Sequence, residues 1–103
     1  MKLRELAYAR SGDKGSDANI GVIAYTEKGY EHLKNILTPE QVANHFECPH
    51  PKRVTRFELP NLLAFNFILE DILGGGGSIS LAFDAQGKAL GQRLLDMEIP
   101  NYE

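Results

Sequence analysis

Residues 3–25 read LRELAYARSGDKGSDANIGVIAY, two apolar segments on either side of a polar one. The first segment, Leu3 to Ala9, has mixed alternation and predicts a strand. The second, Ala18 to Tyr25, is apolar at both parities, which is typical of a strand that is central in its sheet or covered on both sides. The eight residues between them, Arg10 to Asp17, are all of loop-forming or charged types and predict a loop. A strand, a long polar loop and a second strand therefore open the chain.

The remaining residues predict three helices and three more strands. Apolar residues at helical spacing favour the first helix, and Thr38 as N-cap with Pro39 at the first helical position starts the second. The predicted elements are a helix over 27–37, a short helix from Thr38 to about Phe46, a strand over 52–58, an apolar helix over 61–73, a strand over 78–84, a turn at Gln86-Gly87 and a strand over 90–99. This order, ββ-αα-β-α-ββ, predicts an α+β fold with helices on one face of a mostly antiparallel sheet.

Length, charge and cysteine content exclude several classes of protein. With 103 residues and 43% apolar composition, the chain is expected to form one domain over residues 1–103. Its net charge is −3 and its Lys and Arg residues are not clustered, so no nucleic-acid partner is expected. A single cysteine, a charged start and no apolar run of membrane-spanning length favour a cytoplasmic protein without a membrane partner.

The polar segment from Arg10 to Asp17 is the first candidate site. Its glycines allow successive backbone N–H groups to converge on an anion, and its cationic and hydroxyl side chains add donors. The candidate ligand-binding residues here are Arg10, Ser11, Gly12, Asp13, Lys14, Gly15 and Asn19. Asp13 and Asp17 are candidates for proton transfer, although carboxylates repel an anion. The alternative is a hairpin loop whose Ser and Asp side chains bond their own backbone.

Four consecutive glycines, Gly74 to Gly77, form the second candidate. One glycine suffices to end a helix, so the run suggests close backbone approach by a ligand or a partner chain. It has neither the P-loop pattern nor the strand-to-helix context of a dinucleotide fingerprint. Gly75, Gly76, Gly77 and Ser78 are therefore candidate ligand-binding residues, and a flexible connector is the alternative.

Other polar residues give weaker signals. The run from His45 through Cys48 to His50 matches no established zinc spacing, and the acidic residues from Asp13 onward do not fit a calcium loop, so no metal or cofactor is expected. Neither Cys48 nor any of the three histidines receives a role. Asn66, inside the apolar 61–73 segment, is expected to be a buried amide with satisfied hydrogen bonds rather than to face a pocket.

Four motifs in order along the chain resemble a known family, the AtuA-like domain, which is the C-terminal module of acyclic terpene utilisation proteins and also occurs as a free-standing chain. The motifs are Ala9-Arg10-Ser11-Gly12-Asp13-Lys14-Gly15, Ala18-Asn19-Ile20-Gly21-Val22, Glu58-Leu59-Pro60-Asn61-Leu62 and Leu73-Gly74-Gly75-Gly76-Gly77-Ser78. The resemblance covers Leu3 to about Ile99. It implies a ferredoxin-like two-layer fold, whose plain βαββαβ order differs from the predicted order, and a setting in the catabolism of branched or terpenoid acyl-CoA compounds.

The resemblance brings no catalytic residues, so two functions from different classes remain open and no reaction is named. In the first, the domain binds or transforms an acyl-CoA or another anionic small molecule at the Arg10–Asp17 segment. In the second, it is a non-catalytic interaction domain that docks onto a protein carrying an AtuA-type N-terminal domain, or onto itself as a homo-oligomer.

Overall fold

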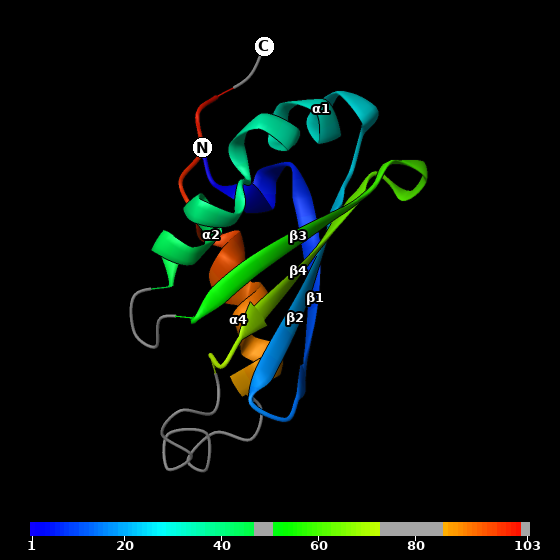
Figure 1. Cartoon of the computed structure of the whole chain (residues 1–103). Coiled ribbons are helices and arrows are strands. Elements are labelled where there is room, and N and C mark those ends of the chain that lie inside the picture. The colour runs from blue at the N-terminus through cyan, green and yellow to red at the C-terminus, as the bar shows by residue number, and fades with distance from the viewer. Residues whose placement is uncertain (47–50, 73–85, 102–103) are drawn as a thin grey trace.

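The computed structural model describes residues 1–46, 51–72 and 86–101. These residues form, in chain order, η1 (Leu3–Glu5), β1 (Ala7–Lys14), β2 (Asp17–Ala24), α1 (Glu27–Ile36), α2 (Pro39–His45), β3 (Arg53–Leu59), η2 (Pro60–Leu62), β4 (Ala64–Glu70) and α4 (Gln86–Leu95), where η marks a 3₁₀ helix (Figure 1). The strand predicted over 78–84, the glycine run 74–77 and Cys48 lie outside the described residues.

The four strands form one antiparallel sheet in the order β1-β2-β4-β3. The central position predicted for the second strand is confirmed, because β2 lies between β1 and β4. The sheet is therefore antiparallel as predicted, with β1 and β3 at its edges.

The order of the strands identifies the fold. The crossover from β2 to β3 leaves a gap that β4 fills, and β2 lies between β1 and β4. If β1 were moved from the start of the chain to its end, the order would read βααββαβ. That is the βαββαβ arrangement of the ferredoxin-like fold with one extra helix. The described chain is thus a circular permutation of that arrangement.

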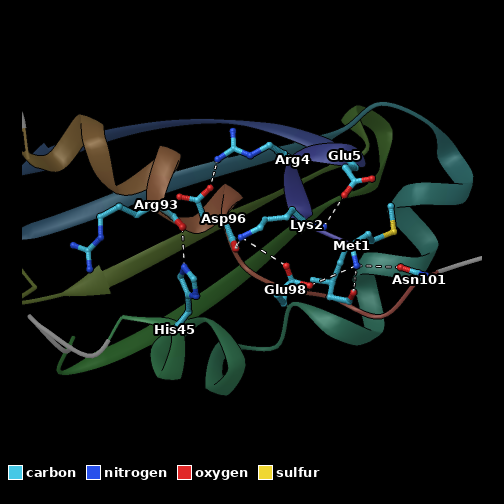
Figure 2. Close-up of polar contacts among 10 residues, drawn as sticks. Met1, Lys2, Arg4, Glu5, His45, Arg93, Asp96, Glu98 and Asn101 are labelled. Atoms are coloured by element: carbon cyan, nitrogen blue, oxygen red, sulfur yellow. Dashed lines mark hydrogen bonds and ion pairs between the residues drawn. The ribbon is translucent and has the colours of Figure 1, made fainter.

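The two ends of the described chain lie side by side, as this permutation requires. Leu3 N donates to Met97 O at 2.9 Å, Ile99 N donates to Met1 O at 2.8 Å, and Lys2 pairs with Glu98 in an antiparallel bridge. The side chains of Lys2 and Glu98 also form an ion pair (Figure 2). Arg4 donates a hydrogen bond to the Asp96 carboxylate across the same junction. This bond is the main reason that the pKa of Asp96 is lowered from its ordinary value.

The core lies between one face of the sheet and the helices. Alternate residues of β2 and β4 point toward the helices and are buried, and α1 and α4 supply the opposing side chains. The main contributors are Ile20, Val22, Phe65, Phe67, Leu69, Tyr30, Leu33, Leu90 and Leu94. The rings of Tyr30 and Phe65 stack with their centroids 4.7 Å apart. In the described part of the chain no element covers the opposite face, which is called the open face below.

Both predicted helices of the first half are confirmed, with boundaries set by their caps. The Thr26 hydroxyl accepts from Gly29 N at 2.9 Å at the start of α1, and the Thr38 hydroxyl accepts from Gln41 N at 3.1 Å at the start of α2. Pro39 occupies the first turn of α2, where its missing N–H costs nothing. The predicted strand over 52–58 is also confirmed as β3, and Pro60 follows its end.

The helix predicted over 61–73 is wrong, because the segment forms η2 and then strand β4. Leu63 takes a left-handed backbone with φ of 54°, which separates the two elements. The segment is apolar nearly all round because β4 is a central strand. One of its faces lies in the core and the other contributes Ala64 and Ile68 to the open face. A short apolar run of this kind has no period that distinguishes a strand from a buried helix.

The turn at Gln86-Gly87 and the strand over 90–99 are also wrong, since Gln86–Leu95 forms helix α4. The alternation of Leu95, Met97 and Ile99 that predicted a strand belongs to the extended chain after the helix. There Met97 and Ile99 are buried and pair with the N-terminal residues. Two adjoining elements were thus merged into one.

Candidate functional site

The polar segment from Arg10 to Asp17 is a hairpin, and the prediction of an eight-residue loop is wrong. Strand β1 continues to Lys14, which pairs with Asp17, so that only Gly15 and Ser16 form the turn. Gly15 takes φ of 65°, which primed two-residue turns require at their first central position. Successive N–H groups of a strand point in opposite directions. The convergent N–H cluster expected of an anion-binding loop therefore does not form in this segment.

The hairpin divides the candidate residues between two faces of the sheet. Arg10 and Gly12 lie on the open face with Asn19, whereas Ser11 and Asp13 have the opposite parity. The Ser11 hydroxyl accepts from Gly91 N of α4 at 2.9 Å, and this bond holds the helix against β1. A Cβ at Gly91 would lie 3.0 Å from that hydroxyl, so the close approach depends on glycine. Ser11 thus has a role in packing.

Asp17 also makes a structural contact. Its Oδ1 accepts from Asp71 N at 2.8 Å, just after the end of β4, where Asp71 has φ of 59°. This bond ties the start of β2 to the end of β4. Gly75, Gly76, Gly77 and Ser78 follow within a segment outside the described residues, so their part in a site stays a prediction.

A depression of about 660 Å³ lies on the open face, and it is called the apolar depression. Its lining residues are Tyr8, Arg10, Gly21, Ile23, Phe57, Leu59, Leu62, Ala64, Phe65 and Asn66. Its centre is hollow because the two central strands carry small residues there, Gly21 in β2 and Ala64 in β4. The atom nearest to a Cβ built on Gly21 is the Arg10 carbonyl oxygen at 3.8 Å, so the space above this glycine is open.

Large apolar side chains surround the hollow. The exposed large hydrophobic residues of the described chain are Tyr8, Tyr25, Phe57, Leu59 and Leu62. Four of them line the apolar depression, and the fifth, Tyr25, stacks on Tyr8 with ring centroids 5.7 Å apart. Sequence reasoning missed this group. The sequence did contain a signal for it. Tyr8 in β1 and Phe57 in β3 are large apolar residues that lie on the same strand face as polar or exposed neighbours.

One row of residues across the sheet gives the depression its polar groups. Cross-strand pairing places Arg10, Gly21, Asn66 and Phe57 side by side on β1, β2, β4 and β3. Within the described residues, the side chains of Arg10 and Asn66 have no hydrogen-bond or ion-pair partner. The expectation that Asn66 is a buried and satisfied amide is wrong, since it is half-buried and lines the depression. A guanidinium and a carboxamide thus point onto an apolar hollow with their donors unused.

A second depression of about 330 Å³ lies farther along the same face and is called the amide depression. It is lined by Asp17, Ala18, Asn19, Asn66 and Ile68. Asn66 belongs to both depressions, so the two adjoin. The Asn19 side chain, like those of Arg10 and Asn66, has no hydrogen-bond partner in the described part of the chain.

Metal-binding residues do not converge in the structure as far as it is described. No group of three or more His, Cys, Asp or Glu side chains there is close enough to hold an ion. His45 Nε2 lies 2.7 Å from the Arg93 carbonyl oxygen, which occupies one ring nitrogen. Among the described helices, none combines the length and apolar composition that a membrane span requires.

Comparison with known proteins supports the fold and identifies the family. No curated protein and no solved structure matches the chain. A family model, the AtuA ferredoxin-like domain, matches residues 1–100, which include every described strand and helix. The match agrees with the permuted ferredoxin-like topology and with the resemblance of the four sequence motifs. The chain therefore belongs to the AtuA ferredoxin-like domain family.

Proposed function

We propose that the domain binds a small amphipathic anion on the open face of its sheet. The apolar part of the ligand occupies the apolar depression, and its carboxylate or phosphate pairs with Arg10. The resemblance to AtuA-type proteins favours branched or terpenoid acyl compounds as the ligand class, and the depression is suited to them. A volume of about 660 Å³ lies within the usual range for small-molecule sites.

The observation that carries this proposal is that Arg10, which has no ion-pair or hydrogen-bond partner among the described residues, lies beside an apolar hollow. Arg53, on the edge strand β3, pairs with the carboxylate of its cross-strand neighbour Glu70 at 2.8 Å. The row that contains Arg10 holds no carboxylate at its other three positions. A guanidinium presents several donors in a plane that matches a carboxylate or phosphate.

The lining of the apolar depression favours binding over catalysis. Among the described residues, the lining contains one permanent cation, one amide and apolar or aromatic side chains, with no acid to serve as a general base. Asp13 lies at the opposite parity of β1, and Asp17 lines the amide depression and holds Asp71 N. We therefore propose an accessory, ligand-holding role in acyl-group metabolism and assign no reaction.

The test compares two molecules that share one carbon skeleton. The probes are 3,7-dimethyloctanoate and the uncharged 3,7-dimethyloctanol, titrated by isothermal calorimetry or NMR. With a dozen or so non-hydrogen atoms, the acid should bind with a Kd of roughly 0.05–1 mM. A charge-assisted hydrogen bond is worth about 1.5–3 kcal/mol, so the acid should bind at least roughly tenfold tighter than the alcohol.

Replacement of Arg10 should abolish that preference. In Arg10→Gln the acid and the alcohol should bind alike, while Arg4→Gln, a change at an exposed arginine of η1, should keep the wild-type preference. Equal affinities of acid and alcohol for the wild-type protein, or an unchanged preference in Arg10→Gln, would remove Arg10 from the site.

A second candidate function, docking of a larger AtuA-type partner, is favoured by the exposed apolar side chains. The five residues are 40–65% exposed. Since an aromatic side chain buries roughly 150–250 Å² when fully covered, the group offers about 500 Å². A specific interface buries about 800 Å² on each partner. The patch is therefore too small for a stable homo-oligomer by itself, and a protein partner would have to contact further surface.

Co-expression with a protein that carries an AtuA-type N-terminal domain tests the docking function. If docking occurs through the open face, Phe57→Ser should abolish co-purification without changing the fold of the domain. If the two proteins do not co-purify, or if Phe57→Ser has no effect on co-purification, the open face is not the docking surface.

A further inference from the structure

The open face becomes steadily more polar along the direction of its strands. Cross-strand pairing defines a first row of Tyr8, Ile23, Ala64 and Leu59, a second of Arg10, Gly21, Asn66 and Phe57, and a third of Gly12, Asn19, Ile68 and Thr55. The first row is apolar, the second adds a cation and an amide, and the third adds a second amide and a hydroxyl. Successive rows lie roughly 7 Å apart, because they are two residues apart along each strand.

The apolar depression spans the first two rows, and the amide depression continues from the second row to the third and beyond. Asn66 lines both, and Asn19 and Asn66 are diagonal neighbours on the adjacent strands β2 and β4. Diagonal partners on one sheet face lie about 7–8 Å apart, which one extended polar arm can span. The two depressions thus form one continuous surface, and this surface extends beyond the length that the carboxylate of a fatty acid would cover.

The chemistry of the amide depression selects neutral polar groups. Each carboxamide offers both a donor and an acceptor, and neither Asn19 nor Asn66 uses them within the described structure. The Asp17 carboxylate on the same lining disfavours a second anion. Amide and hydroxyl groups, which donate and accept, match such a lining.

We propose that the amide depression is a second subsite that binds a neutral, amide- or hydroxyl-bearing arm attached to the acyl group. The inference rests on the proposed function and extends its ligand class from free acids to acyl conjugates, in which Arg10 donates to a neutral carbonyl group in place of a carboxylate. The acyl chain lies over the first row. The carbonyl group at its end contacts Arg10 and Asn66 in the second row, and the arm continues to Asn19.

Two neutral probes that differ only in the arm test this subsite. One is the N-methylamide of 3,7-dimethyloctanoic acid, and the other carries the same acyl group on β-alanine N-methylamide, which adds one amide and about one row of length. The longer probe should bind the wild-type domain at least fivefold tighter. Asn19→Ala should abolish this gain and leave the affinity of the shorter probe unchanged. Asn35→Ala, at an exposed residue of α1, should change neither affinity.

The outcomes separate this inference from the proposed function. If 3,7-dimethyloctanoate binds in an Arg10-dependent way and the two amides bind equally, the second subsite is refuted and the first remains. If Asn19→Ala weakens both amides equally, Asn19 does not recognise the arm and the inference also fails. If neither the acid nor either amide binds, both proposals are refuted.

Discussion

Gly21 has no side chain, and its position at the centre of the open face is therefore hollow. A Cβ there has its nearest contact at 3.8 Å, and glycine inside a strand ordinarily weakens the strand. The position therefore offers a change that fills the proposed site without crowding the core. We expect the backbone of its cross-strand neighbours, Arg10 and Asn66, to stay in place in such a variant.

Gly21→Val should reduce the affinity for 3,7-dimethyloctanoate at least tenfold, because the valine side chain occupies the floor of the apolar depression. The melting temperature should stay equal to the wild-type value or rise, since valine favours strands. Calorimetric titration and thermal unfolding give the two quantities. Gly12→Ala, on the same face but outside the apolar depression, is the control and should bind normally. Normal binding by Gly21→Val would place the ligand elsewhere.

Strand β3 carries two arginines in different surroundings. Arg56 makes contacts that hold the fold together, whereas Arg53 is exposed to solvent. Arg56 Nη1 donates to the Lys34 and Leu37 carbonyl oxygens at 2.8 and 2.9 Å, and its guanidinium lies over the Phe65 ring. These carbonyls lie at the C-terminal end of α1, where a cation is favoured. The Arg56 side chain is 16% exposed, against 70% for Arg53.

Arg56→Met should lower the free energy of unfolding by about 2 kcal/mol, because it leaves the carbonyls at the end of α1 without their charged donor. Arg53→Met should cost less than about 1 kcal/mol, as expected of an exposed ion pair. Urea unfolding measures both. Equal costs for the two substitutions would contradict the role given to Arg56.

At the scale of elements, the sequence predicted those parts of the fold that local chemistry determines. Thr38 and Pro39 specify the start of α2 by local chemistry, and the apolar residues at both parities of β2 agree with its central position. The hairpin could not be read this way, because β1 is an edge strand with polar residues exposed on the open face and near the turn. Those residues look like a loop until their partner strand is known.

The candidate site was predicted in part, for a related reason. Arg10 and Asn19 were selected for their polarity, and both lie on the open face. Tyr8, Phe57 and Leu62 come from three different elements, and only the sheet order β1-β2-β4-β3 places them around one hollow. No local pattern contains that order, so the apolar half of the site required the structure.

The junction between η1 and the chain after α4 should make stability depend on pH. Because the Arg4 hydrogen bond lowers the pKa of Asp96, the carboxylate stabilises the folded state at pH values above the ordinary aspartate pKa. This contribution is lost as the pH falls through the lowered pKa. Asp96→Asn should therefore be slightly less stable than wild type at pH 7, and the difference should shrink as the pH falls below the ordinary aspartate range. A difference that persists at low pH, measured by thermal unfolding, would contradict the assignment.

The whole molecule is a permuted ferredoxin-like domain as far as the structure describes it. Its ends are joined by hydrogen bonds between residues 1–3 and 97–99, so a short linker can connect them. The Gly15-Ser16 turn then becomes the natural place for new termini, since it lies at the tip of the β1–β2 hairpin.

A circular permutant that starts at Ser16 and ends at Gly15 should fold with the same sheet and bind the same acid. The described helices and strands would then follow one another along the chain as βααββαβ, and the open face would be unchanged. Circular dichroism, thermal unfolding and one titration are sufficient to test this. An unfolded permutant would show that the order of elements along the chain matters beyond the contacts that they make.

NMR titration of the ¹⁵N-labelled domain with 3,7-dimethyloctanoate shows directly whether the open face binds an amphipathic anion. Saturable shifts are expected for the backbone amides of Arg10, Gly21, Ile23 and Asn66 and for the Asn66 side chain, while the exposed residues of α1 stay unchanged. Shifts confined to α1, α2 or α4, or no saturable shift up to several millimolar acid, would contradict it.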